Sequence, residues 1–134
     1  MSVFTVPIEV RNGGGTDFQT LDAWVDTGSF YSALPQPFLE ALGVLAHRRE
    51  QFMLADGTIT ERDLGRMWVR IGDRSEVTLV IFAEPESPPI LGAYTLEGLA
   101  LAVDPVNERL VPMPWLLRAA LVGDPAERTE CATV

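Results

Sequence analysis

Residues 24–35, WVDTGSFYSALP, place an acid at the end of an apolar segment that has the composition of a β-strand. A carboxylate at a buried strand end is costly unless it is hydrogen-bonded or takes part in chemistry. Around Asp26, the side chains of Thr27 and Ser29 offer hydroxyl donors, and Gly28 lets the backbone approach the carboxylate because it has no Cβ. The segment therefore predicts an oriented carboxylate at Asp26.

An ordinary turn is the alternative interpretation of the same triplet. Aspartate often caps a turn with its own carboxylate. An Asp-(Thr/Ser)-Gly triplet also arises by chance in about one chain in twenty at average residue usage. The triplet alone favours a turn residue, whereas its place after an apolar strand favours a chemical role for Asp26.

The sequence on either side has the spacing of an all-β domain, with short strands parted by glycine and proline turns. Asp56-Gly57 predicts a tight reversal, because both central positions of such a turn need positive φ. Prolines at the start and Gly43 at the end predict a short helix over 35–44. Other expected elements are a hairpin of 3–10 with 18–26, strands flanking the reversal within 47–63, strands at 66–72 and 76–84, a helical turn within 90–99, and a hairpin over 100–112 turning at Asp104 to Asn107.

Length and charge limit the function classes. The 134 residues predict one domain over 1–122 and a flexible tail over 123–134. With 19 acidic against 10 basic residues and a net charge of −9, nucleic acid and anionic membranes are not expected partners. No apolar run is long enough to span a bilayer, and the N-terminus lacks the pattern of a secretory signal, so a cytoplasmic location is expected.

Metal and cofactor chemistry is not expected either. His47 is the only histidine, which argues against a histidine-based metal site and against a Ser-His triad. The glycines at 13–15 lack the following helix that a phosphate-binding loop needs. Cys131 is the only cysteine, so an intrachain disulfide is excluded.

Four features occur in a fixed order along the chain. They are VDTGS at 25–29, SALP at 32–35 leading to a short helix, the MLADGTIT hairpin at 53–60, and Ile90-Leu91-Gly92. In this order they resemble the retropepsin-like aspartic proteases, the retroviral-type group with its stand-alone bacterial relatives. The resemblance runs from about Phe4 to Pro112. It implies an all-β acid-protease barrel with one or two short helices that forms a dimer.

The resemblance implies an aspartic endopeptidase whose catalytic residue is Asp26. Because the chain has a single such triplet, it implies a homodimer in which paired Asp26 carboxylates from two protomers activate a water molecule. The substrate is then a peptide or protein. In this scheme the Thr27 hydroxyl bridges to the other protomer's loop, Gly28 offers its amide to the carboxylates, and Ser29 offers its hydroxyl to an outer oxygen.

The resemblance also assigns residues that contact the substrate. The flap that closes over it comprises Ala55, Asp56, Gly57, Thr58 and Ile59. Phe30 and Tyr31 stand where the family often has acids, which implies a more apolar subsite. Ile90, Leu91 and Gly92 form the structural motif that packs beneath the catalytic loop. The flap tip has only Gly57, fewer glycines than retroviral flaps, and the chain continues beyond the point where those enzymes end.

Two other functions fit the same residues. The chain can be a non-catalytic dimerisation or peptide-binding module on the same fold, because a fold does not determine a function. It can also be a small β-barrel that binds a ligand, with a structural Asp26 and no need for a dimer. Cleavage lost on substitution of Asp26 distinguishes the enzyme from both.

Overall fold

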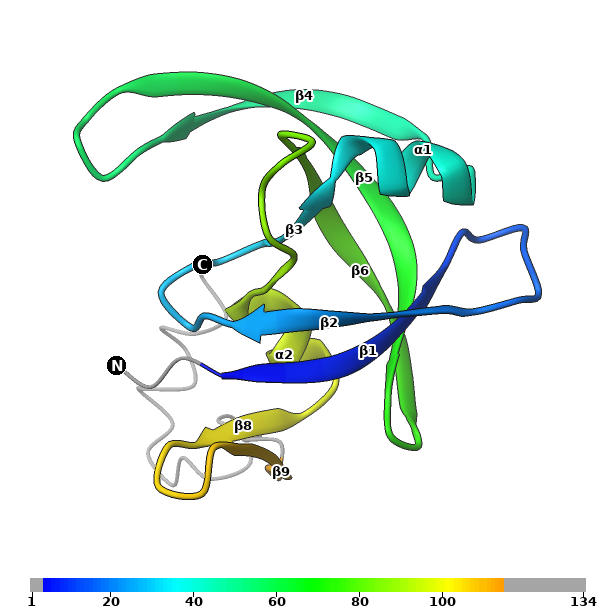
Figure 1. Cartoon of the computed structure of the whole chain (residues 1–134), viewed down its shortest axis with the longest axis vertical. Coiled ribbons are helices and arrows are strands. Elements are labelled where there is room, and N and C mark those ends of the chain that lie inside the picture. Colours follow the sequence, from blue (N-terminus) through cyan, green and yellow to red (C-terminus); the bar gives the residue numbers. More distant parts are fainter. Residues whose placement is uncertain (1–3, 115–134) are drawn as a thin grey trace, which may run out of the picture.

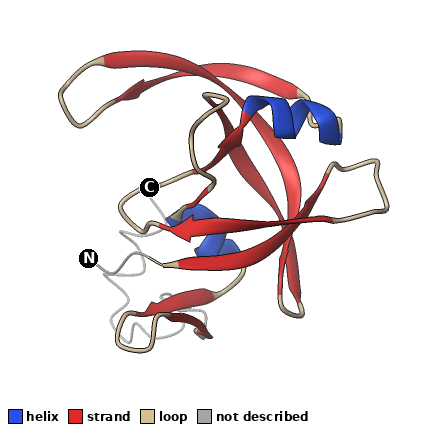
Figure 2. Cartoon of the chain, viewed as in Figure 1, coloured by secondary structure: helices blue, strands red, loops and turns tan. Residues whose placement is uncertain are grey.

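The structure, a computed structural model, describes residues 4–114. Strands dominate it and two short helices accompany them (Figures 1 and 2), so the expected all-β class is confirmed. The expected tail at 123–134 and the last part of the expected domain lie outside the described residues. In chain order the elements are β1 (Thr5–Arg11), β2 (Gln19–Val25), β3 (Ser32–Pro35), α1 (Gln36–Leu42), β4 (Ala46–Met53), β5 (Ile59–Ile71), β6 (Arg74–Ala83), β7 (Ile90–Leu91), α2 (Ala93–Gly98), β8 (Leu101–Asp104) and β9 (Arg109–Pro112).

Seven strands form one sheet that closes on itself. Their order is β1-β2-β7-β3-β6-β5-β4, and β1 also pairs with β5, which joins the two sides into a barrel. The pairs β2–β7 and β3–β6 are parallel, and the other pairs in this sheet are antiparallel. β8 and β9 form a separate two-stranded sheet. Closure removes most of the exposed edge that an open sheet would leave, and β4, which pairs with β5 alone, remains at an edge.

A salt bridge with two hydrogen bonds accompanies the closure between β1 and β5. Glu9 and Arg70 are register partners, and the Arg70 guanidinium donates to the two carboxylate oxygens of Glu9 at 3.0 and 2.7 Å. The hydrogen bond from Arg70 lowers the pKa of Glu9. Arg70 also lies 4.0 Å from the centre of the Phe18 ring, so the cation is in contact with an aromatic face.

The core fills the interior of the barrel. Alternate side chains along a strand point into this interior. In β6, for example, Thr78, Val80 and Phe82 are buried, whereas the residues between them are more exposed. α1 covers one end with Leu39, and α2 contributes Leu96 (Figure 1). Other buried core residues are Ile8, Val10, Ala23, Val25, Leu34, Met67, Val69 and Leu91.

α1 begins and ends where the sequence predicts. A proline stands in its first turn, and Gly43 ends it in a left-handed conformation with φ of 82°. The side chain of Asn12 donates to the carbonyl of Leu42, so the tip of the β1–β2 hairpin is attached to the end of this helix. No helix within residues 4–114 has the length and apolar character needed to cross a membrane.

The strand β5 differs from expectation. Separate strands were expected before and after Gly65, but the structure has one continuous strand of 13 residues. The physical reason is that Gly65 does not form a turn. It allows the backbone of Leu45 to approach β5, because a Cβ at this position would lie 2.8 Å from the carbonyl oxygen of Leu45. Opposite this point, the register of β4 shifts between Ala46 and Arg48. β3 is a second difference, since its residues were expected only as a lead into the helix.

Candidate active site

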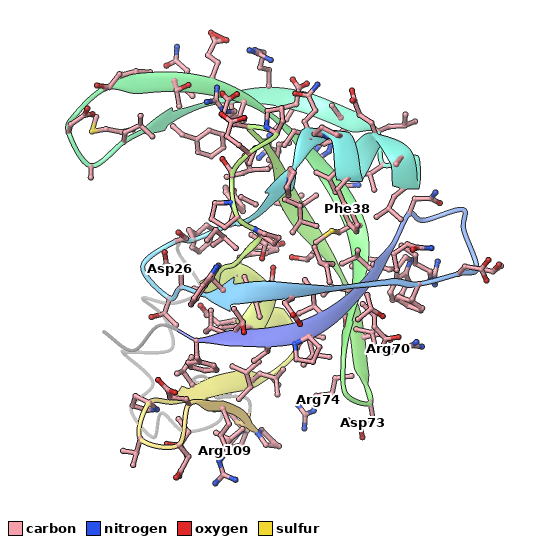
Figure 3. All side chains as sticks on the ribbon, viewed as in Figure 1. Asp26, Phe38, Arg70, Asp73, Arg74 and Arg109 are labelled. Carbon is pink, nitrogen blue, oxygen red and sulfur yellow. The ribbon has the colours of Figure 1, made fainter. Side chains whose placement is uncertain are left out.

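Asp26 follows the last residue of β2 and lies in the loop that leads to β3 (Figure 3). Val25 pairs with Leu91 of β7 in parallel register. The amide of Asp26 donates to the carbonyl of Leu91 at 3.0 Å. Leu91 therefore holds the backbone of Asp26 in place.

The loop supplies a donor to each oxygen of the Asp26 carboxylate. The amide of Gly28 donates to Oδ1 at 3.0 Å, and the hydroxyl of Ser29 donates to Oδ2 at 3.2 Å. The amide of Ser29 donates to the backbone carbonyl of Asp26 at 3.1 Å, which closes a tight turn. The side chain of Asp26 is half-buried. Its position is thus set by its own loop while one side stays accessible.

Thr27 is exposed, and among residues 4–114 its hydroxyl has no hydrogen-bond partner. This residue therefore offers a free donor and acceptor next to the carboxylate. The sequence assigned Thr27 to a contact with a second protomer. That contact stays a prediction.

Gly92 packs directly against the chain that follows the carboxylate. A Cβ at Gly92 would lie 2.6 Å from the carbonyl carbon and oxygen of Tyr31 and 2.8 Å from the carbonyl oxygen of Phe30. The first amides of α2 continue this contact, since Ala93 donates to Ser29 at 2.9 Å and Tyr94 donates to Phe30 at 2.8 Å. Only glycine leaves enough space for the two segments to approach this closely.

A chain of hydrogen-bonded hydroxyls begins at the amide of Gly92. The amide of Gly92 donates to the Ser32 hydroxyl at 3.0 Å, and that hydroxyl lies 2.6 Å from the hydroxyl of Thr95. Thr95 in turn lies 2.8 Å from the hydroxyl of Thr78, which donates to the carbonyl of Leu79 at 3.3 Å. Because the Ser32 hydroxyl accepts from Gly92, it can donate to Thr95, which then donates to Thr78. With this order each of the three hydroxyls accepts one hydrogen bond and donates one.

Four aromatic rings form a cluster beside the Asp26 loop. The ring centres of Phe30 and Tyr31 are 4.9 Å apart, and Tyr94 of α2 lies 5.5 Å from Phe30 and 5.8 Å from Tyr31. Phe52 of β4 joins the cluster at 6.3 Å from Tyr31. The sequence analysis pointed to Phe30 and Tyr31 but missed Tyr94 and Phe52. The position of Tyr94, two residues after Gly92, was the available indication.

The expected flap is the end of the β4–β5 hairpin. Figure 1 shows this hairpin extending past the barrel on the same side as the loop after β2. Its tip turns at Gly57, which has φ of 87°, and the amide of Thr58 donates to the Asp56 carboxylate at 2.9 Å. Hydrogen bonds from Thr58 lower the pKa of Asp56.

The five expected flap residues, Ala55 to Ile59, are exposed. Within the described part of the chain no hydrogen bond or ring contact joins them to Asp26. The hairpin instead reaches the Asp26 loop through Phe52, which contacts Tyr31. Residues 4–114 contain no group of three or more His, Cys, Asp and Glu side chains that could hold a metal ion.

Comparison with known proteins bears on the fold alone. No protein-family model matches the chain, and no curated protein matches it. Among solved structures, the chain is similar to the solution structure of simian foamy virus (mac) protease. The two are 18% identical with a TM-score of 0.49, over 69% of this chain and 92% of the viral one. A similarity at this level concerns the fold and says nothing about activity.

Proposed function

We propose that the chain is an aspartic endopeptidase that acts as a homodimer. The observation that supports it is the Asp26 loop. A carboxylate at a strand end receives one donor on each oxygen, from Gly28 and Ser29, and Gly92 packs beneath the loop with no room for a side chain. The turn residue Asp104 also has donors on both carboxylate oxygens, so what sets Asp26 apart is its half-buried place after β2 and the close packing of Gly92 against the chain that follows it.

The dimer follows from the number of carboxylates. The chain has one Asp-Thr-Gly triplet, and an aspartic mechanism needs two carboxyl groups facing each other. A two-fold axis beside the loop brings Asp26 of both protomers together, and it brings the two exposed Thr27 side chains together as well. Two carboxylates a few ångströms apart cannot both ionise easily, so the pair shares one proton.

In the proposed mechanism the ionised carboxylate takes a proton from the bound water, whose oxygen attacks the carbonyl carbon of the scissile peptide bond. The protonated carboxyl donates its proton to the carbonyl oxygen. The tetrahedral intermediate then collapses: the C–N bond breaks, the leaving amine takes a proton from one carboxyl, and a hydroxyl of the intermediate returns a proton to the other, which restores the singly protonated dyad. Gly28 and Ser29 keep each carboxylate oriented through these transfers.

The β4–β5 hairpin is the proposed lid. Its tip carries exposed apolar side chains, with Met53 at 71%, Leu54 at 49% and Ile59 at 52% exposed. Exposed apolar residues on a hairpin tip favour contact with a substrate or with a second tip. Closure over a bound peptide excludes water from the carboxylates.

The test is cleavage of a diverse peptide library from acidic to neutral pH at high protein concentration. Asp26→Asn is expected to abolish cleavage and to keep the fold, because an asparagine oxygen still accepts from the Gly28 amide. Asp22→Asn is the matched control, since Asp22 lies on the same strand and is exposed. Full activity of the Asp26 variant would refute the proposal. Peptide binding without cleavage at any pH would instead support a non-catalytic peptide-binding module.

A further inference from the structure

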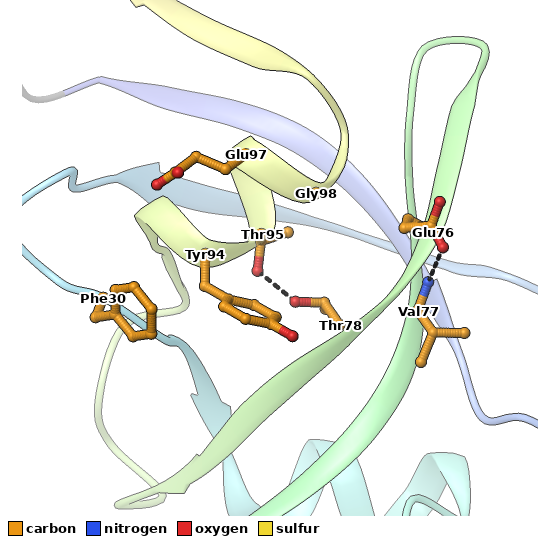
Figure 4. A pocket seen from close by; sticks show the side chains of 8 residues that line it. All are labelled: Phe30, Glu76, Val77, Thr78, Tyr94, Thr95, Glu97 and Gly98. Atoms are coloured by element: carbon orange, nitrogen blue, oxygen red, sulfur yellow. Dashed lines mark hydrogen bonds between the residues drawn. The ribbon is translucent and has the colours of Figure 1, made fainter. Parts of the chain in front are cut away.

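A pocket of 490 Å³ lies between α2 and β6, next to the aromatic cluster (Figure 4). Its volume is within the range of about 300–1,000 Å³ that is typical of ligand sites. Phe30 and Tyr94 stand on one side, Val77 on the opposite side, and Gly98 at the end of α2 leaves part of it open. Apolar side chains thus form much of its wall.

Two carboxylates give the pocket its charge. Glu76 of β6 and Glu97 of α2 both line it, and no basic residue does. Within the described chain neither takes part in a salt bridge. The nearest basic residue in sequence, Arg74, donates to the carbonyls of Leu99 and Ala100 at 2.9 and 3.1 Å. Glu76 accepts only a long hydrogen bond from the amide of Val77, at 3.4 Å (Figure 4), so the pocket combines an apolar wall with negative charge that has no basic partner.

The pocket borders the proposed active site through Phe30. Phe30, four residues after Asp26, is a wall of the pocket and is 58% exposed. The hydroxyls of Thr78 and Thr95, which also line the pocket, belong to the chain that supports Gly92 beneath the Asp26 loop. A peptide that extends past the carboxylates along this side of the loop meets Phe30 and then the pocket.

We propose that this pocket binds an arginine side chain of the peptide substrate, several residues away from the scissile bond. The proposal rests on the proposed protease function and names its substrate class. The long aliphatic part of arginine suits the apolar wall, and the guanidinium pairs with one of the two carboxylates, Glu76 or Glu97, which lie on opposite sides of the pocket (Figure 4). The net charge of −9 also favours a basic peptide over an acidic one.

Arginine is favoured over lysine because of the aromatic side of the pocket. The planar guanidinium stacks on aromatic faces and is less strongly hydrated than an ammonium group. Phe30 and Tyr94 offer two rings whose centres are 5.5 Å apart. Lysine pairs with the same carboxylates but lacks the flat surface that stacks on the rings.

The first test compares pairs of cleavable peptides that differ at one position, with arginine in one and neutral citrulline in the other. The arginine peptide is expected to have a kcat/KM about 10-fold higher, from stacking and an exposed ion pair. In Glu76→Gln/Glu97→Gln this ratio falls toward one. The control Glu40→Gln/Glu86→Gln removes the same number of charges from residues outside the pocket and keeps the ratio. An unchanged ratio in the first double variant would overturn the proposal.

A second variant fills the pocket without removing charge. Gly98 does not have a left-handed φ, and a Cβ there would meet only Glu76 Cγ at 4.0 Å. Gly98→Leu therefore places its side chain in open pocket space without backbone strain. It is expected to remove the arginine preference as well. Retained preference in a folded Gly98→Leu variant would show that arginine binds elsewhere.

A binding experiment separates failure of this proposal from failure of the proposed function. Isotope-labelled Asp26→Asn protein is titrated with N-acetyl-arginine methylamide and its citrulline analogue, and backbone amide shifts are followed by NMR. Shifts at Val77 and Gly98 with arginine alone support the pocket even when no peptide is cleaved. Cleavage without these shifts and without arginine preference supports the protease and overturns the pocket assignment. If the Arg118→Gln/Arg128→Gln variant binds the arginine compound more tightly, the chain's own arginines occupy the pocket. That result would also overturn the proposal.

Discussion

The ring of Tyr31 meets the ring of Phe52 edge to face, with centres 6.3 Å apart and planes at 89°. Tyr31 follows the Asp26 loop, and Phe52 lies on β4, near the end of the hairpin that carries the expected flap. Edge-to-face pairs are a favoured aromatic geometry. This contact is therefore where the proposed lid touches the loop that it would cover.

Removal of this contact is expected to loosen the hairpin. Phe52→Ala should lower kcat/KM about 3- to 10-fold, because an aromatic pair contributes about 0.5–1.5 kcal/mol beyond its buried area. Amide hydrogen exchange of β4 and the first part of β5 should become faster. Met53→Ala is the control, since Met53 is adjacent in sequence but 71% exposed. Equal effects of the two variants would refute a specific role for Phe52.

Substitution of Gly92 is expected to damage the site more than an ordinary glycine substitution. Gly92→Ala places a Cβ 2.6 Å from the Tyr31 carbonyl group, so the Asp26 loop must move. Overpacking of this kind costs about 1–3 kcal/mol of unfolding free energy. Urea denaturation and peptide cleavage measure the two consequences. Gly13→Ala, where no atom lies within 4 Å of the new Cβ, should change neither.

The buried hydroxyl chain predicts a contrast between two variants of Thr95. Thr95→Val keeps the shape but leaves Ser32 and Thr78 without their shared partner, which costs about 1–3 kcal/mol of unfolding free energy. Thr95→Ser keeps the hydroxyl and should restore most of that stability. Thermal or urea unfolding of both proteins is the measurement. Equal stability of the two would mean that the hydroxyls contribute nothing.

A mixing experiment tests the shared active site. When wild-type protein is mixed with equal Asp26→Asn protein and the subunits exchange, about one quarter of dimers keep two intact carboxylates. Activity per wild-type chain should therefore fall by about half relative to unmixed protein at the same total concentration. A monomeric enzyme would show no change per wild-type chain.

The low pKa of Asp104 should keep its carboxylate ionised, and the β8–β9 turn intact, in moderately acidic solution. The Asn107 side chain, followed by Arg109, lowers the pKa of Asp104 from 3.8 to about 2. A depressed folded pKa gives stability that is present above pH 3.8 and is lost as the pH falls through about 2. Carboxyl carbon NMR can follow this titration. Asn107→Ala should move the pKa of Asp104 back toward 3.8, and an unchanged value would show that Asn107 does not cause the shift.

Local sequence rules predicted the parts of the fold that local physics determines. Asp56-Gly57 marked a hairpin, and the chain does reverse there, but of the two residues only Gly57 has the positive φ that was expected of both. Gly43 marked the end of α1, and it too has a positive φ. The expected turn from Asp104 to Asn107 also forms, with the Asp104 carboxylate accepting from the amides of Val106 and Asn107.

The remaining features depend on contacts between distant residues. β7 has only two residues and exists because Ile90 and Leu91 pair with β2, which no local pattern predicts. Gly65 resembled a break between strands, yet its role is to let Leu45 approach. Tyr94 and Phe52 join the aromatic cluster from different elements, so their position near Asp26 follows from the topology alone.

One end of β5 lies in the barrel, and its other end extends from the barrel in the β4–β5 hairpin. As far as Asp63 it pairs with β4 alone, and from Leu64 to Ile71 it pairs with β6, with β1 on its other side over Trp68 to Arg70. We therefore expect a movement of the hairpin tip to bend the two-stranded part of the hairpin, most strongly near Gly65 where this part joins the barrel. There the backbone already packs too tightly against Leu45 to admit a Cβ. If the hairpin acts as the proposed lid, we expect its movement to come from bending of the two-stranded ribbon itself and not from a flexible joint at Gly65.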